Sequence, residues 1–229
     1  MCCLFLAASS TVAIAQTSVV DLVNPIIGTN GMGHTFPGAC VPFGLVQLSP
    51  DTDTIPHNVD GKYQPRSYEY CAGYQHKDSS IVGFSHTHFS GTGHSDLGDI
   101  LIMPTTGTLK LNPGTATNPD GGYRSRFSHG TEISRPGYYE VMLTDYGVKA
   151  QLTTTQRVGI HKYTYPTNSE NQRIILDMIH GIYNYDGKVL WTNIRVENDT
   201  LVTGYRITNG WARTNYTYFA MSFSKPITH

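Results

Sequence analysis

Short apolar runs separated by turn residues form the main pattern of hydrophobic and polar positions along the chain. Helical spacing, with apolar residues at i, i+3, i+4 and i+7, is not sustained in any window free of Gly, Pro or β-branched runs. Strand-like runs recur instead, at 44–48, 80–84, 100–103, 138–144, 148–155, 158–165, 173–178, 190–197, 201–208 and 216–222. This succession of short strands and turns predicts an all-β protein, built as a sandwich or a barrel.

Two pairs of these runs are predicted to form β-hairpins. A tight turn at 145–147 (Asp-Tyr-Gly) joins the fourth and fifth runs, and one at 198–199 (Asn-Asp) joins the eighth and ninth. The first third of the chain differs, because residues 24–104 are dense in Gly, Pro and His and contain long irregular stretches. Long loops in a compact domain are usually functional, so we expect the chemistry of this protein to lie there.

Residues 1–15 have the character of a secretory signal peptide. They contain an apolar stretch and end in Ala13-Ile14-Ala15, an A-x-A cleavage site. No Lys or Arg precedes Asp21, so we expect this signal to be incomplete. The stretch is too short for a transmembrane helix, which needs about 20 apolar residues. We therefore expect a secreted or periplasmic protein without a transmembrane segment, in which residues 16–229 form one β-sandwich domain.

The charge balance argues against one class of partner. The 229 residues carry 16 Lys and Arg against 17 Asp and Glu, which gives a net charge of −1. Nucleic-acid and anionic-membrane binding normally show as excess or clustered basic charge, and neither is present here. After loss of the signal peptide, Cys40 and Cys71 remain, either as one disulfide or as two free thiols.

Histidines gather in the irregular first third of the chain. Six of the ten lie between His34 and His94. His86 and His88 are two positions apart at the end of a predicted strand, so both imidazoles are expected on one face. With His94 or a nearby Asp they would make a transition-metal set. The alternatives are that they line a groove for a polar ligand or only hydrogen-bond to a Gly-rich backbone.

Tyrosines in the same region indicate a different chemistry. Tyr63, Tyr68, Tyr70 and Tyr74 lie within one loop region. A tyrosine ring has an apolar face and a polar tip, which suits a sugar, although ordinary core or rim packing explains single tyrosines equally well. The run 83–87 lacks the final Gly of a G-x-S-x-G nucleophile motif. No carboxylate pair stands out by its spacing, so the residues alone assign no catalytic acid or base.

Several long, ordered motifs resemble one known family. They are VNPIIGT (23–29), GHTFPGA (33–39), VPFGLVQLSPDT (41–52), CAGY (71–74), IVGFSHTHFSGTG (81–93) and DLGDIL (96–101). With a looser resemblance from 138 to 226, these motifs make the chain similar to the N-terminal domain of glycoside hydrolase family 92, the exo-acting, calcium-dependent α-mannosidases.

The resemblance implies an architecture and a substrate. Members have an N-terminal antiparallel β-sandwich of the galactose-mutarotase-like supersandwich type, followed by an (α/α)6 barrel, for which this chain has no matching residues. The barrel supplies most of the catalytic carboxylates and calcium ligands, so the resemblance assigns no catalytic residue and no metal ligand here. It implies substrate contacts at five positions of the sandwich: His34, Tyr68, Cys71, His86 and His88. Tyr68 departs from the Trp that many members carry there.

The function expected from this resemblance is that of a supporting domain. The chain would be the N-terminal carbohydrate-binding part of a secreted α-mannosidase that removes terminal α-linked mannose from glycans with inversion. We expect it to be inactive alone and to expose an apolar patch where the barrel docks. The alternatives are a free-standing carbohydrate-binding sandwich and a small His-ligated metalloprotein.

Overall fold

The computed structural model describes residues 18–53, 55–91 and 96–228, and their regular secondary structure is almost all β-strand. All strand pairs are antiparallel. The helical elements within these ranges are four 3₁₀ turns. These turns are η1 (Val19–Leu22), η2 (Pro65–Tyr70), η3 (Pro119–Gly121) and η4 (His129–Thr131). The predicted all-β fold is therefore confirmed.

Two sheets form the body of the molecule. The first has five strands in the order β1-β2-β6-β7-β13, and the second has four in the order β12-β11-β10-β9. The strands of the first are β1 (Ala39–Cys40), β2 (Gln47–Asp51), β6 (Gly83–Ser85), β7 (Leu101–Thr105) and β13 (Arg173–Asp177). Those of the second are β9 (Ile133–Arg135), β10 (Tyr138–Leu143), β11 (Val148–Thr154) and β12 (Gly159–Thr164).

The main core lies between these two sheets, which makes them a sandwich. Strands β10 and β11 alternate buried and part-exposed residues, so every second side chain faces inward. Their buried side chains meet those of the five-stranded sheet in one cluster, which includes Leu48, Phe84, Met103, Tyr139, Val141 and Leu152. Burying each such side chain contributes roughly 1.5–3 kcal/mol, so this cluster is the main source of stability.

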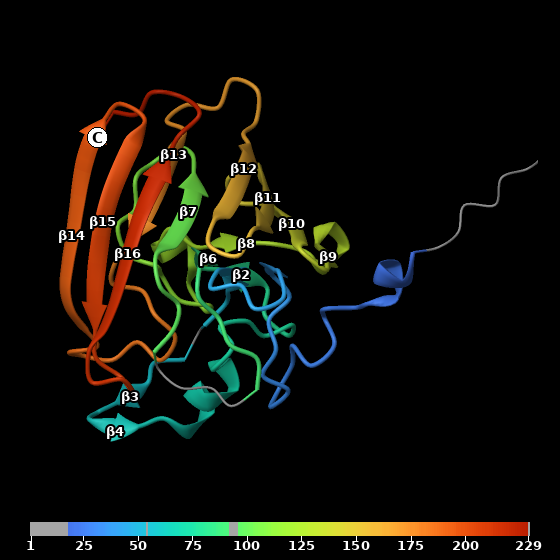
Figure 1. Ribbon diagram of the computed structural model, residues 1–229, viewed down its shortest axis with the longest axis vertical. Helices are drawn as coiled ribbons and strands as arrows, with labels where there is room; N and C mark the ends of the chain where they lie inside the picture. Colours follow the sequence, from blue (N-terminus) through green and yellow to red (C-terminus); the bar gives the residue numbers. More distant parts are fainter. Residues whose placement is uncertain (1–17, 54, 92–95, 229) are drawn as a thin grey trace, which may run out of the picture.

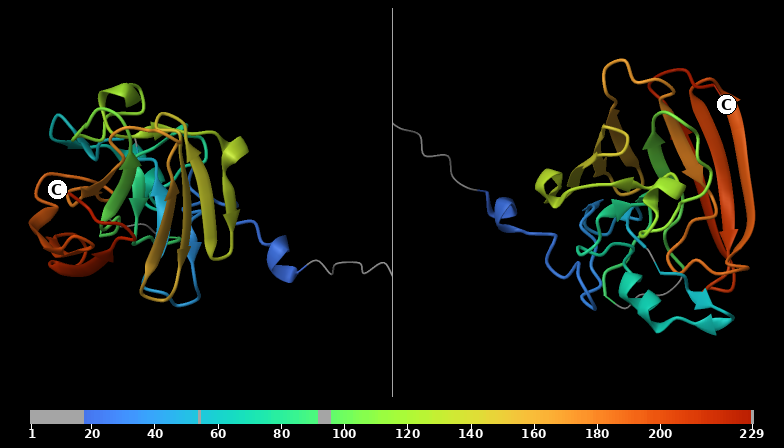
Figure 2. Two further views of the ribbon diagram at one scale, coloured as in Figure 1. Left: turned by 90° about the horizontal axis from the view of Figure 1, so that it is seen from above. Right: turned by 180° about the vertical axis from the view of Figure 1, so that it is seen from behind.

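A third sheet covers the other side of the five-stranded sheet. It has three strands, β14 (Val189–Asn198), β15 (Leu201–Thr208) and β16 (Asn215–Ser222). In Figures 1 and 2 this orange-red sheet lies beside β7 and β13, on the side away from β10–β12. The molecule therefore has three β layers. Two small two-stranded sheets complete it, formed by β3 (Asn58–Val59) with β4 (Lys62–Tyr63) and by β5 (Ser80–Ile81) with β8 (Ser125–Arg126).

Two buried basic side chains connect this third sheet to the body. Arg206 of β15 is fully buried, lies 3.0 Å from Asp99 and donates to the carbonyl of His180 at 2.5 Å. Lys188, just before β14, is also fully buried and donates to the carbonyls of Ile182 and Leu97. Burial lowers the pKa of both groups, and that of Lys188 falls to about 7.

The opposite face of the third sheet is exposed and rich in aromatic side chains. The strand register places Trp191, Ile207 and Tyr216 side by side across the three strands. Tyr205 and Tyr218 pair with each other two residues further along the same face. Trp191, Tyr216 and Tyr218 are each more than half exposed. We call these five residues the outer aromatic face. The described part of the chain therefore exposes a surface rich in aromatic side chains on this sheet.

Most long predicted strands are found within one or two residues of their expected bounds, and both predicted hairpins are confirmed by the pairs β10–β11 and β14–β15. The prediction for 44–48 was wrong in its bounds, because β2 begins only at Gln47. A turn precedes it, in which Phe43 has a positive φ of 60°. The prediction for 80–84 was wrong in a different way. That run divides at Val82 into β5 and β6, which pair in different sheets.

Candidate functional site

Three of the five residues that the resemblance pointed to meet at one end of the sandwich. The ring of His34 stands edge-on to that of Tyr68, with centroids 4.8 Å apart. Tyr68 stacks on Tyr183 at 6.4 Å, and buried Cys71 packs in a small apolar cluster with Ile182 and Tyr183. The elements that bring them together are η2 and the loop from β13 to β14, which run close to each other at the lower end of Figure 1.

Other aromatic side chains extend this group. The ring of His57 lies 5.1 Å from Tyr63, 5.6 Å from Tyr183 and 5.2 Å from Tyr185. Sequence reasoning selected Tyr63 and Tyr68 as a possible sugar surface but missed His57, Tyr183 and Tyr185. The signal for the last two was the Tyr183-Asn184-Tyr185 segment in a loop with Gly181 and Gly187. The aromatic cluster, as named from here on, consists of His34, His57, Tyr63, Tyr68, Cys71, Tyr183 and Tyr185.

Three buried polar atoms of this aromatic cluster lack hydrogen-bond partners among the described residues. His34 Nε2, His57 Nδ1 and Tyr183 Oη are buried, and none has a hydrogen-bond partner among the described residues. Leaving such a group unsatisfied costs about 1–3 kcal/mol. His34 and Tyr183 also have a positive φ of 52°, which is uncommon for residues other than Gly. Strained backbone and unpaired polar groups together are a feature of binding sites.

The charge state of these groups favours neutral donors and acceptors. Burial raises the pKa of the Tyr183 hydroxyl well above its usual value, so it stays protonated and can donate. Burial lowers the pKa of His57, so its imidazole is neutral at pH 7. Asp53 lies near enough to influence the pKa of Tyr183, and burial raises its own pKa to about 6. The aromatic cluster can therefore exchange hydrogen bonds with hydroxyl groups while its rings cover apolar C–H surface.

His88 lies beneath the aromatic cluster rather than in it. Its Nε2 is 2.8 Å from Asp51 Oδ1, and its Nδ1 is 2.7 Å from the carbonyl of Gln47. The other oxygen of Asp51 is 2.8 Å from Nε2 of His180. Burial alone would raise the pKa of Asp51, but His88 and His180 together hold it well below its usual range. Asp51 also lies directly under Gly73, so this buried group supports the turn that carries Cys71.

His86 belongs to a separate pair of imidazoles. Its Nδ1 is 2.7 Å from the carbonyl of Ile100, and its Nε2 is 3.0 Å from Nε2 of His161. Nδ1 of His161 lies 2.7 Å from the hydroxyl of Tyr163. Because a carbonyl only accepts, His86 carries its proton on Nδ1, and His161 then donates from Nε2 and accepts from Tyr163. Burial lowers the pKa of both histidines, which keeps the pair neutral.

The expectation that His86 and His88 project together was therefore wrong. Strand β6 ends at Ser85, so the two-residue alternation does not extend to these residues, and the two rings bond to different partners. His94, the third member of the suggested metal set, lies outside the described residues. Cys40 is an exposed free thiol and Cys71 is buried, so the alternative of a disulfide between them is wrong.

Calcium, which the family resemblance implies, does not fit the donor groups of the described residues. Calcium takes about six to eight oxygen ligands. Asp51 is engaged by two imidazoles, and Asp99 is engaged by Arg206 and by the hydroxyl of Thr87. The one grouping of metal-ligating side chains within the described ranges contains two histidines. We therefore assign no calcium ligand to this part of the chain.

The fold and the aromatic cluster together define a class: an antiparallel β-sandwich protein that presents aromatic and polar side chains at one end of its sheets. The comparisons with known proteins identify the family. The glycosyl hydrolase family 92 N-terminal domain matches residues 22–229, and the chain belongs to this family. No helix in the described part of the chain has the length and apolar character needed to cross a membrane.

Solved structures of related enzymes have the same fold. A family 92 α-mannosidase from Bacteroides thetaiotaomicron, solved in complex with mannoimidazole, is 45% identical with a TM-score of 0.82. The match covers 91% of this chain and 26% of that one. A family 92 inverting mannosidase from the same organism is 26% identical with a TM-score of 0.66, over 93% of this chain and 26% of that one.

A curated relative matches part of the chain. It is described as an uncharacterized secreted glycosidase of Arthroderma benhamiae, and it is 28% identical over 170 residues. That match covers 70% of this chain and 19% of the relative. The chain thus spans about a quarter or less of the length of the relatives that it matches.

Proposed function

We propose that this chain is the N-terminal, carbohydrate-binding part of a secreted or periplasmic α-mannosidase that removes terminal α-linked mannose from glycans with inversion. Family membership and the 45% identity to an α-mannosidase support the substrate class. The inverting mannosidase among the relatives supports the stereochemical outcome. The catalytic carboxylates and the calcium ion of such an enzyme would be supplied outside the described residues.

The observation that carries this proposal is the set of unpartnered polar atoms in the aromatic cluster. His34 Nε2, His57 Nδ1 and Tyr183 Oη are buried without partners. A sugar hydroxyl both donates and accepts, so it can pair with all three kinds of atom. The tyrosine rings around them would lie against the C–H face of the sugar. In this arrangement the side chains of Tyr68, His34 and Cys71 form the binding surface. His88 and His86 lie below that surface, where their hydrogen bonds hold the backbone in place.

Mannose binding to the purified chain tests this role. We expect saturable, weak binding in isothermal titration with methyl α-mannoside. Tyr183→Phe keeps the ring and removes the hydroxyl, so it should weaken binding about three- to tenfold, the equivalent of one hydrogen bond. Tyr218→Phe, which removes a hydroxyl from the outer aromatic face, is the matched control and should bind normally. Equal affinities of the two variants would contradict a role for the aromatic cluster.

A free-standing carbohydrate-binding module is the second candidate, because the same aromatic cluster would serve it. The outer aromatic face favours the first candidate, since its three most exposed rings suit a surface that further protein covers. The two differ in behaviour. A free-standing module should be soluble and monomeric, whereas a supporting domain should self-associate through that face. Neither should hydrolyse an aryl α-mannoside, and normal mannosidase turnover by the purified chain would overturn both.

A further inference from the structure

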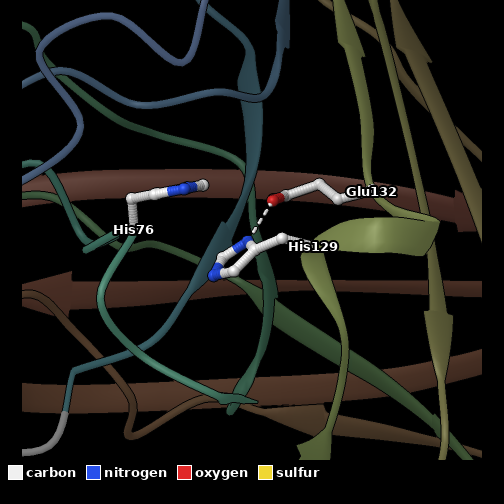
Figure 3. Close-up of side chains that lie close together, drawn as sticks. All are labelled: His76, His129 and Glu132. Atoms are coloured by element: carbon white, nitrogen blue, oxygen red, sulfur yellow. Dashed lines mark hydrogen bonds and ion pairs between the residues drawn. The ribbon is translucent and has the colours of Figure 1, made fainter.

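A second group of side chains lies at the other side of the loop region, away from the aromatic cluster's rings. His76 follows the Cys71–Tyr74 turn, His129 opens η4, and Glu132 comes directly after η4. Each offers one ligand atom, and these atoms all lie within 4.8 Å of one another. Figure 3 shows the ring of His76 lying across from His129 and Glu132, which come from a different part of the chain. The two imidazole centroids are 3.9 Å apart.

Glu132 is held in place as a metal ligand usually is. Its side chain is only 3% exposed. One oxygen accepts hydrogen bonds from Tyr74 at 2.9 Å and from Tyr139 at 2.6 Å, and the other lies 2.7 Å from Nδ1 of His129. Burial is the main cause that raises the pKa of both tyrosines far above the usual value, so both remain donors. Outer groups that orient a ligand in this way are typical of metal sites.

His76 has a ring nitrogen that is free to bind a ligand. Nδ1 of His76 is buried and has no hydrogen-bond partner among the described residues, although it lies among polar groups. An unpartnered buried nitrogen next to a second imidazole and a carboxylate is a costly arrangement for a protein without a ligand there. A cation would pair with that nitrogen and neutralise the nearly buried carboxylate.

The donor set selects the kind of ion. Calcium and magnesium prefer oxygen ligands, whereas two imidazoles and one carboxylate are ligands of zinc and of other divalent transition metals. Zinc sites with three protein ligands keep a fourth position for water. His129 is exposed and Glu132 is fixed, so the site can close by rotation of the His129 and His76 side chains.

We propose that His76, His129 and Glu132 bind one zinc ion, with the fourth position open to solvent. The ion would join the loop that follows the Cys71–Tyr74 turn to the segment that leads into β9. These two parts of the chain are more than fifty residues apart in sequence. The site is separate from the proposed sugar surface and does not depend on it, so either proposal can fail without the other.

Zinc titration of the metal-free full chain tests this proposal. We expect one zinc ion per chain by native mass spectrometry and a zinc-dependent rise in melting temperature. His76→Gln should lower zinc affinity at least tenfold, because it removes a ligand that makes no other hydrogen bond through Nδ1. Cobalt in place of zinc should give the visible absorption of a four-coordinate site, and His76→Gln should abolish that absorption.

The control is a glutamate in a similar environment. Glu140 accepts a hydrogen bond from Tyr138 at 2.5 Å and lies 2.9 Å from Lys149, but no histidine accompanies it. Glu132→Gln should lose zinc binding, and Glu140→Gln should keep it. If Glu132→Gln fails to fold, His76→Gln still decides the question, because His76 is only partly buried. Absence of saturable zinc binding, or equal binding by His76→Gln and the unaltered chain, would overturn the proposal.

Discussion

Gly73 gives the sharpest test of how the buried Asp51 supports the CAGY turn. Its φ is +81°, and a Cβ added there would lie 2.2 Å from Asp51 Oδ1. That oxygen is the one that bonds to His88. Gly73→Ala must therefore displace Asp51 and break at least one hydrogen bond to a charged group. Gly61 is a matched control, because its φ is +73° and an added Cβ would meet nothing within 4 Å.

The two substitutions share one cost and differ in the other. A left-handed backbone costs an alanine about 1–2 kcal/mol, and the lower entropy of the unfolded chain returns about 0.4–1 kcal/mol of this. Gly61→Ala should therefore lose about 0–1.6 kcal/mol. Gly73→Ala loses in addition about 1.5–3 kcal/mol for the hydrogen bond. The expected difference between the variants is about 2 kcal/mol, a large share of a typical total stability of about 5–15 kcal/mol.

Equilibrium unfolding in urea measures this difference. With a slope of about 2 kcal/mol/M, the midpoint of Gly73→Ala should lie about 1 M below that of Gly61→Ala. The imidazole NMR signals of His88 and His180 should shift in the first variant only. Equal midpoints for the two variants would refute the argument, because they would mean that Asp51 moves aside at no cost.

Two further predictions concern pH. Burial lowers the pKa of His86 and His161, so below pH 6.5 the unfolded chain binds protons that the folded chain does not. As the pH falls, stability should therefore decrease by up to about 1.4 kcal/mol per pH unit for each histidine. His161→Gln should make this fall shallower in urea unfolding between pH 7 and pH 5, and an unchanged slope would contradict the neutral pair. The second prediction concerns Lys188, whose pKa is lowered to about 7, mainly by burial and next by the nearby Arg206. Between about pH 7 and pH 10 the unfolded chain therefore holds a proton that the folded chain lacks. Stability should rise with pH over this range. Lys188→Met should remove that part of the rise, and a parallel pH profile for the two proteins would show that the buried amine stays charged.

Regular strands were predictable because their side chains alternate against a core. Tyr138–Leu143 and Val148–Thr154 follow the two-residue pattern closely, and the Asp-Tyr-Gly turn between them fixes their register. The short strands β1, β3, β4 and β8 were missed, since a pair of residues carries no periodic signal. They are placed by their pairing partners across the sheet. β1 pairs with β2 and β3 pairs with β4, both close by in the sequence, whereas β8 pairs with β5 more than forty residues away.

The candidate site was only partly predictable, because residues far apart in the sequence come together in it. His34, Tyr68 and Cys71 could be named from local motifs. Tyr183 joins them from more than one hundred residues further along the chain, and only the fold brings it there. The His76, His129 and Glu132 group was missed because sequence spacing pointed to the local pair His86 and His88 instead. Spacing was a poor guide to the surroundings of His86 and His88, because the strand that would align these two side chains ends at Ser85.

The exposed tryptophans of the third sheet also provide an intrinsic fluorescence signal. The chain has two tryptophans, Trp191 and Trp211, and they are 61% and 79% exposed. Both belong to the third sheet or to the loop between its last two strands. Their fluorescence should therefore resemble that of indole in water in the folded state and change little on unfolding. Any protein that covers this sheet would shift the emission to shorter wavelength, so its docking can be followed without a label.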